Sequence, residues 1–176
     1  MSWYNPDRGF WYYLPPSDYK YKPGFACFDL DWTLVRPSRG KFPANPSDNV
    51  IMNGRIDVLR DLYDKGYNIV IFTNQKLTPQ HNLEYKLTRM NDIITKFKQE
   101  GINLLLFMSI LDDKYRKPNV GMWEYLVEIF RGQITTAYTF YCGDAAGRPG
   151  DHSSDDIDFA KNIGIMFYTP EELFQK

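Results

Sequence analysis

Two aspartates, Asp29 and Asp31, end the apolar stretch FACFDLDWTLV with a single leucine between them. Like charges at this spacing repel each other unless a positive charge lies nearby. A hard divalent cation such as Mg2+ prefers oxygen ligands and needs few of them from the protein. We therefore expect a carboxylate oxygen of Asp29 and the backbone carbonyl of Asp31 to bind such an ion.

Other polar residues follow further apolar stretches of the chain. Thr73 and Asn74 end NIVIFTN, Asp144 follows AYTFYCG, and Lys117 lies in YRKPNVG just before a helical pattern. In open α/β sheets, ligands bind beyond the carboxyl ends of the parallel strands. These side chains are therefore expected to meet at one edge of a sheet, where the Asp144 carboxylate would be a further ligand of the cation.

This set of side chains suits phosphoryl transfer. With its charge offset by the cation, Asp29 could attack phosphorus and form an aspartyl-phosphate. Asp31 could protonate the leaving oxygen and later take a proton from the water that cleaves the intermediate. Thr73, Asn74 and Lys117 would bind the phosphoryl oxygens as negative charge develops.

The elements that must position these residues alternate between strand and helix patterns. Apolar runs predict strands over 24–29, 68–73, 103–109, 137–143 and 165–169. Helical spacing predicts helices over 57–66, 79–100, 120–130 and 156–164, with a short one opening at Pro170. The alternation predicts one α/β domain over residues 1–176, a three-layer Rossmann-like fold with a mainly parallel sheet between helices.

Two segments lie outside this alternation. The aromatic segment 1–23 contains FWYYL followed by two prolines, which predicts an edge strand or hairpin packed on the core. Residues 36–49, RPSRGKFPANPSDN, are rich in turn residues and are expected to form a loop or flap. The connections after Asp31 and Gln75 are too short for a sizeable cap domain.

Composition narrows the class of protein. The net charge of −1 gives no long-range attraction to nucleic acid or to an acidic membrane, so any polyanion must meet a local patch. Cys27 and Cys142 lie in apolar runs and are expected to be reduced, and His81 and His152 to lie at the surface. With neither a signal peptide nor a membrane span in the sequence, we expect an intracellular protein, nuclear or cytoplasmic.

The segments DLDWT, FTNQ, RKP and GDAAGR resemble the motifs of haloacid dehalogenase (HAD) phosphatases. Within that superfamily, KFPANPSD, RKPNVGMW and GDAAGRPG resemble the phosphatase domain of polynucleotide kinase 3'-phosphatase, from about Gly24 onwards. The resemblance implies a HAD-like fold and Mg2+-dependent removal of a 3'-phosphate from DNA ends through an aspartyl-phosphate.

The resemblance also implies roles for individual residues. By motif, Asp29 is similar to the nucleophile, Asp31 to the acid and base, and Asp144 to a metal ligand. Thr73, Asn74 and Lys117 are similar to the phosphate binders. Asp156 resembles the acidic residue that supports the lysine or the metal, and the neighbouring Asp155 is the alternative.

The chain departs from the family pattern in three places. Trp32 stands where glycine is common, either packing against the flap or offering a stacking surface to the substrate. The segment after FTNQ lacks the usual glycine-rich turn. The sequence contains no G-x-x-x-x-G-K-[ST] phosphate loop, so kinase activity is not expected.

An uncapped site would admit a polymer end, and basic residues near it could meet DNA phosphates. Arg148 is the best candidate because GDAAGR places it just beyond Asp144. The others are Arg39 and Lys76, followed by Arg36, Lys41, Lys114 and Arg116.

The expected partner is a single-stranded or frayed DNA end that carries a 3'-phosphate. Two other readings stay open: a phosphatase of the same mechanism acting on a phosphoprotein or small phosphate ester, and a non-catalytic module that binds DNA ends or a protein partner.

Overall fold

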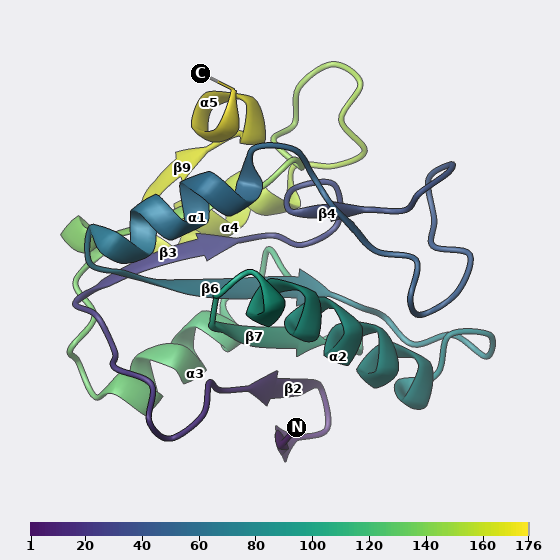
Figure 1. The fold of residues 1–176 in the computed structure, drawn as a ribbon, viewed down its shortest axis with the longest axis horizontal. Helices are drawn as coiled ribbons and strands as arrows, with labels where there is room; N and C mark the ends of the chain where they lie inside the picture. The colour runs from purple at the N-terminus through teal and green to yellow at the C-terminus, as the bar shows by residue number, and fades with distance from the viewer. Residues whose placement is uncertain (176) are drawn as a thin grey trace.

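A seven-stranded sheet forms the centre of the computed structural model, which describes residues 1–175 (Figure 1). Its strand order is β1-β2-β7-β6-β3-β8-β9. The parallel strands are β3 (Gly24–Phe28), β6 (Tyr67–Asn74), β7 (Leu104–Ser109), β8 (Thr139–Cys142) and β9 (Met166–Tyr168). Strands β3 and β7 are buried along their whole length, as expected for apolar strands covered on both faces.

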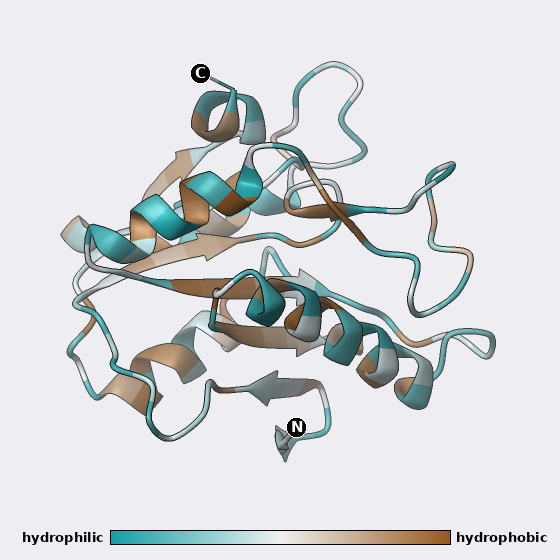
Figure 2. Ribbon diagram, viewed as in Figure 1, coloured by the Kyte–Doolittle hydropathy of each residue, from teal (hydrophilic) through white to brown (hydrophobic). Residues whose placement is uncertain are grey.

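Helices cover both faces of the sheet. The first face carries α1 (Arg55–Asp64), α2 (Leu83–Gln99) and α5 (Pro170–Phe174), whose apolar residues share one core. The opposite face carries α3 (Gly121–Phe130) and α4 (Asp155–Ile163), which belong to a second core. A short 3-10 helix, Thr136–Tyr138, precedes β8. Figure 2 shows the hydrophobic strands at the centre and the hydrophilic outer sides of the helices. The predicted fold class is confirmed.

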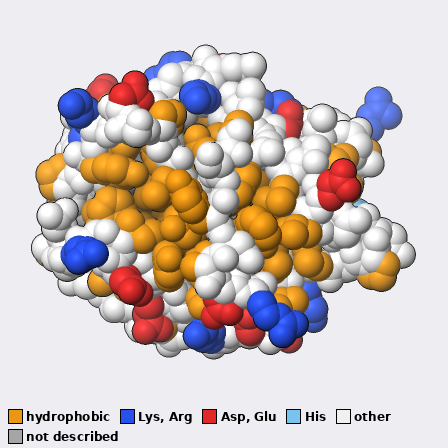
Figure 3. Space-filling model, turned by 90° about the horizontal axis from the view of Figure 1, so that it is seen from below, with side chains coloured by type: hydrophobic (Ala, Val, Ile, Leu, Met, Phe, Trp, Pro, Cys, Tyr) orange, Lys and Arg blue, Asp and Glu red, His pale blue; other side chains and the backbone are white. Residues whose placement is uncertain are grey.

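The aromatic N-terminal segment forms a hairpin at one edge of the sheet. Strand β1 (Trp3–Asp7) pairs with β2 (Phe10–Tyr13), which pairs antiparallel with β7. Phe10 is fully buried and its ring stacks on Tyr115 at 4.2 Å. Seen from below, this side of the molecule carries a broad spread of hydrophobic side chains (Figure 3).

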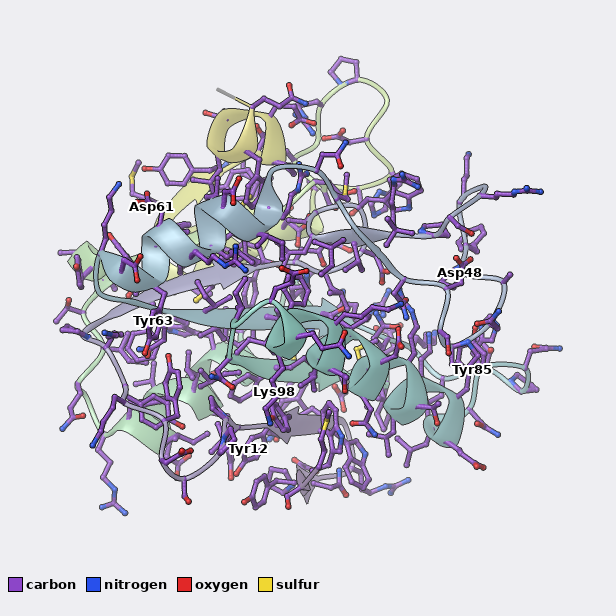
Figure 4. The ribbon with its side chains drawn as sticks, in the orientation of Figure 1. Tyr12, Asp48, Asp61, Tyr63, Tyr85 and Lys98 are labelled. Carbon is purple, nitrogen blue, oxygen red and sulfur yellow. The ribbon has the colours of Figure 1, made fainter. Side chains whose placement is uncertain are left out.

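Residues 37–49, here called the flap, project beyond the carboxyl ends of the parallel strands. The loop or flap predicted over 36–49 is present, and β4 (Val35–Arg36) and β5 (Val50–Ile51) pair at its base. Two-residue strands are too short to give a hydrophobic period. Inside the flap, Asp48 accepts hydrogen bonds from the backbone N–H groups of Ser38 and Ala44, both at 2.9 Å. Figure 4 shows Asp48 at the same end of the molecule as Tyr85 at the start of α2.

Helix starts differ from the sequence prediction by a few residues. Helix α1 begins at Arg55 rather than 57, and α2 begins at Leu83 rather than 79. The Asn82 side chain explains the second start, because it accepts a hydrogen bond from the backbone N–H of Tyr85 at 3.0 Å. Between β6 and β7, the described chain forms α2 and short loops rather than a cap domain. Among residues 1–175, no helix combines the length and apolar character needed to span a membrane.

Candidate active site

Lys117 lies at the centre of a buried ionic cluster. Its Nζ is 2.9 Å from Oδ1 of Asp29, at the end of β3, and 2.9 Å from Oδ1 of Asp156, on α4. The lysine side chain is 3% exposed, so these contacts are shielded from water. Three segments that are distant in sequence are therefore joined by one ammonium group.

Asp156 is fixed in place on both of its oxygens. Oδ1 accepts a hydrogen bond from the hydroxyl of Tyr141 at 2.8 Å, and Oδ2 accepts one from the backbone N–H of Ala145 at 3.0 Å. Tyr141 also accepts a hydrogen bond from Lys117 at 2.7 Å. Of the two candidate supporting acids, the structure therefore brings Asp156 to Lys117. Asp155, at the start of α4, donates its backbone N–H to Ser153 Oγ.

Asp29, Asp144 and Asp156 each place a carboxylate oxygen within 4.8 Å of the others. The Asp156 side chain is only 3% exposed, against 13% for Asp29, and it lies behind Lys117, so Asp29 and Asp144 are the better candidates for binding a cation. Thr33 lies between them, with its hydroxyl 3.2 Å from Asp29 Oδ2 and 3.5 Å from Asp144 Oδ1. An all-oxygen donor set of this kind fits a hard divalent cation.

The charge balance of the cluster also fits a cation. Burial raises the pKa of Asp29 well above its usual range, and the neighbouring charges of Asp156 and Asp144 raise it further, although Lys117 opposes them. Burial likewise raises the pKa of Asp144. Burial disfavours the charged form of Lys117, but Asp156 and Asp29 outweigh it and raise its pKa. One lysine for three carboxylates leaves excess negative charge that a divalent ion would offset.

Thr73 and Asn74 end β6 next to this cluster. The Asn74 side chain accepts a hydrogen bond from the backbone N–H of Lys117 at 2.9 Å and donates one to its carbonyl at 3.1 Å. Asn74 therefore fixes the backbone that carries the lysine. Thr73 is 1% exposed, and its hydroxyl accepts a hydrogen bond from Gln75 Nε2 at 2.9 Å.

Asp31 is held by residues that sequence reasoning missed. Arg89 on α2 forms an ion pair with Asp31 Oδ1, and its Nη1 donates to Oδ2 at 3.3 Å. Gln75 Nε2 donates to the same Oδ2 at 2.9 Å. The sequence held a signal for this ion pair. Arg89 lies at positions i, i+4 and i+8 with Ile93 and Phe97, so all three share the buried side of α2. A charged residue on the buried side of a helix is almost always paired with an opposite charge.

The proposed substrate-binding residues surround this cluster more loosely. Arg148 pairs with Asp151 and Glu171, both at 2.9 Å, and its Nη2 donates to the carbonyl of Asp144 at 3.3 Å. Its guanidinium therefore supports the loop that carries Asp144. Arg39 on the flap and Lys76 after β6 are exposed.

Trp32 has an unusual backbone conformation, with a φ of 64° in the left-handed region that favours glycine. Its indole Nε1 donates to the carbonyl of Lys41 in the flap at 3.3 Å, and the residue is 38% exposed. Trp32 thus contacts the flap and also leaves part of its ring open to solvent.

Comparisons with known proteins agree with this geometry. The family model described as polynucleotide kinase 3 phosphatase matches residues 24–174. The chain is 38% identical to a bifunctional polynucleotide phosphatase/kinase of Schizosaccharomyces pombe, over 85% of this chain and 37% of that protein. It is 35% identical to a polynucleotide 3'-phosphatase of Arabidopsis thaliana, over 85% of this chain and 24% of that protein. The chain thus spans less than half the length of these two relatives.

Two solved structures share the fold. A protein from Mesorhizobium loti, described as a HAD-like phosphatase, superposes with a TM-score of 0.73 at 16% identity, over 92% of this chain and 78% of that one. A D,D-heptose 1,7-bisphosphate phosphatase from B. bronchiseptica, in complex with magnesium and phosphate, gives a TM-score of 0.64 at 17% identity, over 83% and 79%.

Proposed function

Because the chain belongs to the polynucleotide kinase 3 phosphatase family, we propose that it is a Mg2+-dependent polynucleotide 3'-phosphatase that removes the phosphate from DNA 3' ends. The observation that carries the proposal is the position of Lys117, whose Nζ is 2.9 Å from the Asp29 carboxylate at the carboxyl end of β3. This contact supports Asp29 as the nucleophile, with a fixed positive charge beside it for the phosphoryl group.

In the first step, a carboxylate oxygen of Asp29 attacks phosphorus, and the bond between phosphorus and the 3' oxygen breaks. Asp31 gives its proton to that oxygen, which leaves as the 3' hydroxyl of the DNA. In the second step, water attacks phosphorus and gives a proton to Asp31. The bond to Asp29 breaks, which releases inorganic phosphate and restores both aspartates.

Lys117 makes this attack electrostatically possible. Its ammonium lies beside Asp29 and offsets charge as an anionic nucleophile approaches an anionic phosphate. Asp156 and Tyr141 hold Lys117 from behind, and Asn74 holds its backbone. Thr73 stands at the end of β6 as the hydroxyl candidate for the phosphoryl oxygens.

Mg2+ would be held by the carboxylates of Asp29 and Asp144, with the backbone carbonyl of Asp31 as a further ligand. When bound, it supplies charge compensation for the phosphoryl oxygens. Arg148 contributes indirectly, because it holds the backbone of Asp144.

In the described chain, the connection between β6 and β7 forms no cap domain, which favours a polymer end as substrate. The flap beside it carries Arg39, and the Trp32 ring is partly exposed where a terminal base could stack. Lys76 is exposed shortly after the end of β6, the strand that carries Thr73 and Asn74. With only these local contacts and a net charge of −1, binding should favour unpaired ends and depend weakly on salt.

A panel of labelled substrates tests the proposal: oligonucleotides with a 3'-phosphate or a 5'-phosphate, an RNA with a 3'-phosphate, and a free 3'-mononucleotide. We expect the 3'-phosphorylated DNA to react fastest, with Mg2+ required and Asp29→Asn inactive in a folded protein. Equal rates on all substrates would leave a general phosphatase of small esters. No turnover on any of them, with DNA ends still bound, would indicate a binding module.

A further inference from the structure

Arg89 is a buried charged residue that has no direct role in the two reaction steps above. Its side chain is 4% exposed, and a buried guanidinium is unfavourable unless its hydrogen bonds are satisfied. Its partners therefore indicate its role. The two Nη atoms contact both oxygens of Asp31, and Nε donates to Oδ1 of Asn49 at 2.9 Å.

The contact with Asp31 has the geometry of an orienting clamp. Two parallel N–H donors on two carboxylate oxygens fix the plane of the carboxylate as well as its position. Gln75 adds a third donor at 2.9 Å. The Asp31 side chain itself is 38% exposed, so one side meets the clamp and the other side faces solvent, where substrate would enter.

The remaining donor of the Arg89 guanidinium, Nε, reaches the base of the flap at Asn49. Asn49, which accepts from Arg89, donates its Nδ2 to the carbonyl of Pro46 and to Oδ2 of Asp92, both at 2.8 Å. Lys96, one turn after Asp92 on α2, donates to the carbonyl of Asn49 at 2.8 Å. Helix α2 therefore holds Asp31 and the flap through one continuous polar network.

We infer that Arg89 is the positioning residue of Asp31. Through Asn49, it also fixes the position of this acid and base relative to the flap. The inference rests on the proposed function, because it assigns Asp31 the proton transfers. The clamp on both oxygens fixes the position and plane of the Asp31 carboxyl group, from which the proton is given to the 3' oxygen and to which water later gives a proton.

The chemistry of the leaving group separates positioning from simple structural support. A 3' hydroxyl is a poor leaving group that needs a proton, whereas p-nitrophenolate leaves without one. Loss of Asp31 positioning should therefore spare formation of the aspartyl-phosphate from p-nitrophenyl phosphate. It should slow cleavage of that intermediate, so that a burst of p-nitrophenolate precedes slow turnover.

The experiment compares Arg89→Met with the wild-type protein, with Asp31→Asn as reference and with Arg60→Met as a matched control at an exposed ion pair with Glu100. We expect Arg89→Met to lower kcat on 3'-phosphorylated DNA by about tenfold to 100-fold. Its first turnover of p-nitrophenyl phosphate should stay within about threefold of wild type and show the burst, as in Asp31→Asn. Asn49→Ala should give a smaller effect in the same direction, and Arg60→Met none.

An equal loss on both substrates without a burst would show that Arg89 only supports the fold, and unchanged kinetics would show that Asp31 needs no clamp. If Arg89→Met does not fold, Arg89→Lys keeps the buried charge without the fork and is expected to show the burst with a milder loss. A thymidine 3'-monophosphate arm separates the two proposals. Wild-type protein that hydrolyses this ester but not DNA ends would overturn the polynucleotide substrate, while the same comparison would still test Arg89.

Discussion

Gly143, at the end of β8, lies against the carboxylate of Asp156 so closely that a Cβ on it would be 2.4 Å from both Cγ and Oδ2. This approach lets Asp156 reach back from α4 to Lys117 and Tyr141. A side chain at position 143 would displace Asp156, which binds Lys117. Glycine is therefore required here because no larger residue fits.

Gly143→Ala should therefore lower turnover strongly and destabilise the protein by about 1–3 kcal/mol, the usual effect of overfilling a packed site. Urea unfolding and kcat on the same preparation check this. Gly101→Ala is the control, because it meets no atom within 4 Å but has a φ of 78°. It should lose stability through backbone strain and keep normal kcat. Normal turnover in Gly143→Ala would show that Asp156 is dispensable.

Lys117→Met should abolish measurable turnover and reduce the free energy of unfolding by about 3–5 kcal/mol, because two buried carboxylates lose their partner. The pH dependence of the free energy of unfolding shows whether Lys117 is charged in the folded protein. The pKa of Lys117 is raised in the folded protein above the ordinary 10.5, so its contribution is complete below pH 10.5 and is lost above it.

The stability difference between wild type and Lys117→Met should thus shrink by about 1.4 kcal/mol for each pH unit above 10.5. Urea unfolding of both proteins at pH 8 and at a pH above 11 measures it, and tyrosine ionisation common to both largely cancels. A difference that stays constant over this range would mean that folding leaves the pKa of Lys117 unchanged, and a difference that grows with pH would mean that the buried amine is uncharged.

Asp144→Asn should weaken Mg2+ binding while leaving the apo protein folded. The change removes one of two carboxylates available to the ion but keeps an oxygen for the Thr33 contact. Wild type should gain thermal stability as Mg2+ is added, and the variant should need a much higher concentration for the same gain. Equal Mg2+ titrations of the two proteins would remove Asp144 from the metal site.

Trp32→Gly tests the exposed ring. Glycine relieves the left-handed backbone at φ 64°, a gain of about 1 kcal/mol that offsets the lost hydrogen bond to Lys41. We expect unchanged stability, and a KM for single-stranded 3'-phosphorylated DNA that rises several-fold while the KM for a 3'-mononucleotide does not. A parallel rise for both substrates would indicate that Trp32 shapes the phosphate site rather than a base-stacking surface.

The sequence predicted the sheet and helices well, because the apolar runs of β3, β6 and β7 and the helical spacing of α2 are strong local signals. It also predicted that Asp29, Lys117 and Asp144 would meet, since the carboxyl ends of parallel strands share one edge. The structure brings these side chains together, and their chemical roles stay predictions.

What the sequence could not predict depends on contacts between distant residues. Asp155 and Asp156 are neighbours on α4, so their side chains point in different directions, and Asp156 is the one that reaches Lys117. The ion pairs of Arg148 with Asp151 and Glu171 could not be inferred from the position of Arg148 after Asp144 in the sequence. The clamp of Arg89 on Asp31 joins residues whose separation in sequence carries no local pattern.

The position of β3 between β6 and β8 has a consequence for the newly made protein. Asp29 is synthesised early, but its own backbone N–H bonds to the carbonyl of Cys142 at 2.9 Å, and Asp144 and Asp156 follow later still. While the chain is emerging from the ribosome, Asp29 has beside it neither the Asp144 carboxylate nor Asp156, which binds Lys117. The proposed phosphatase activity should therefore arise only when β8 and α4 have docked on the sheet, so a partly synthesised chain should be inactive.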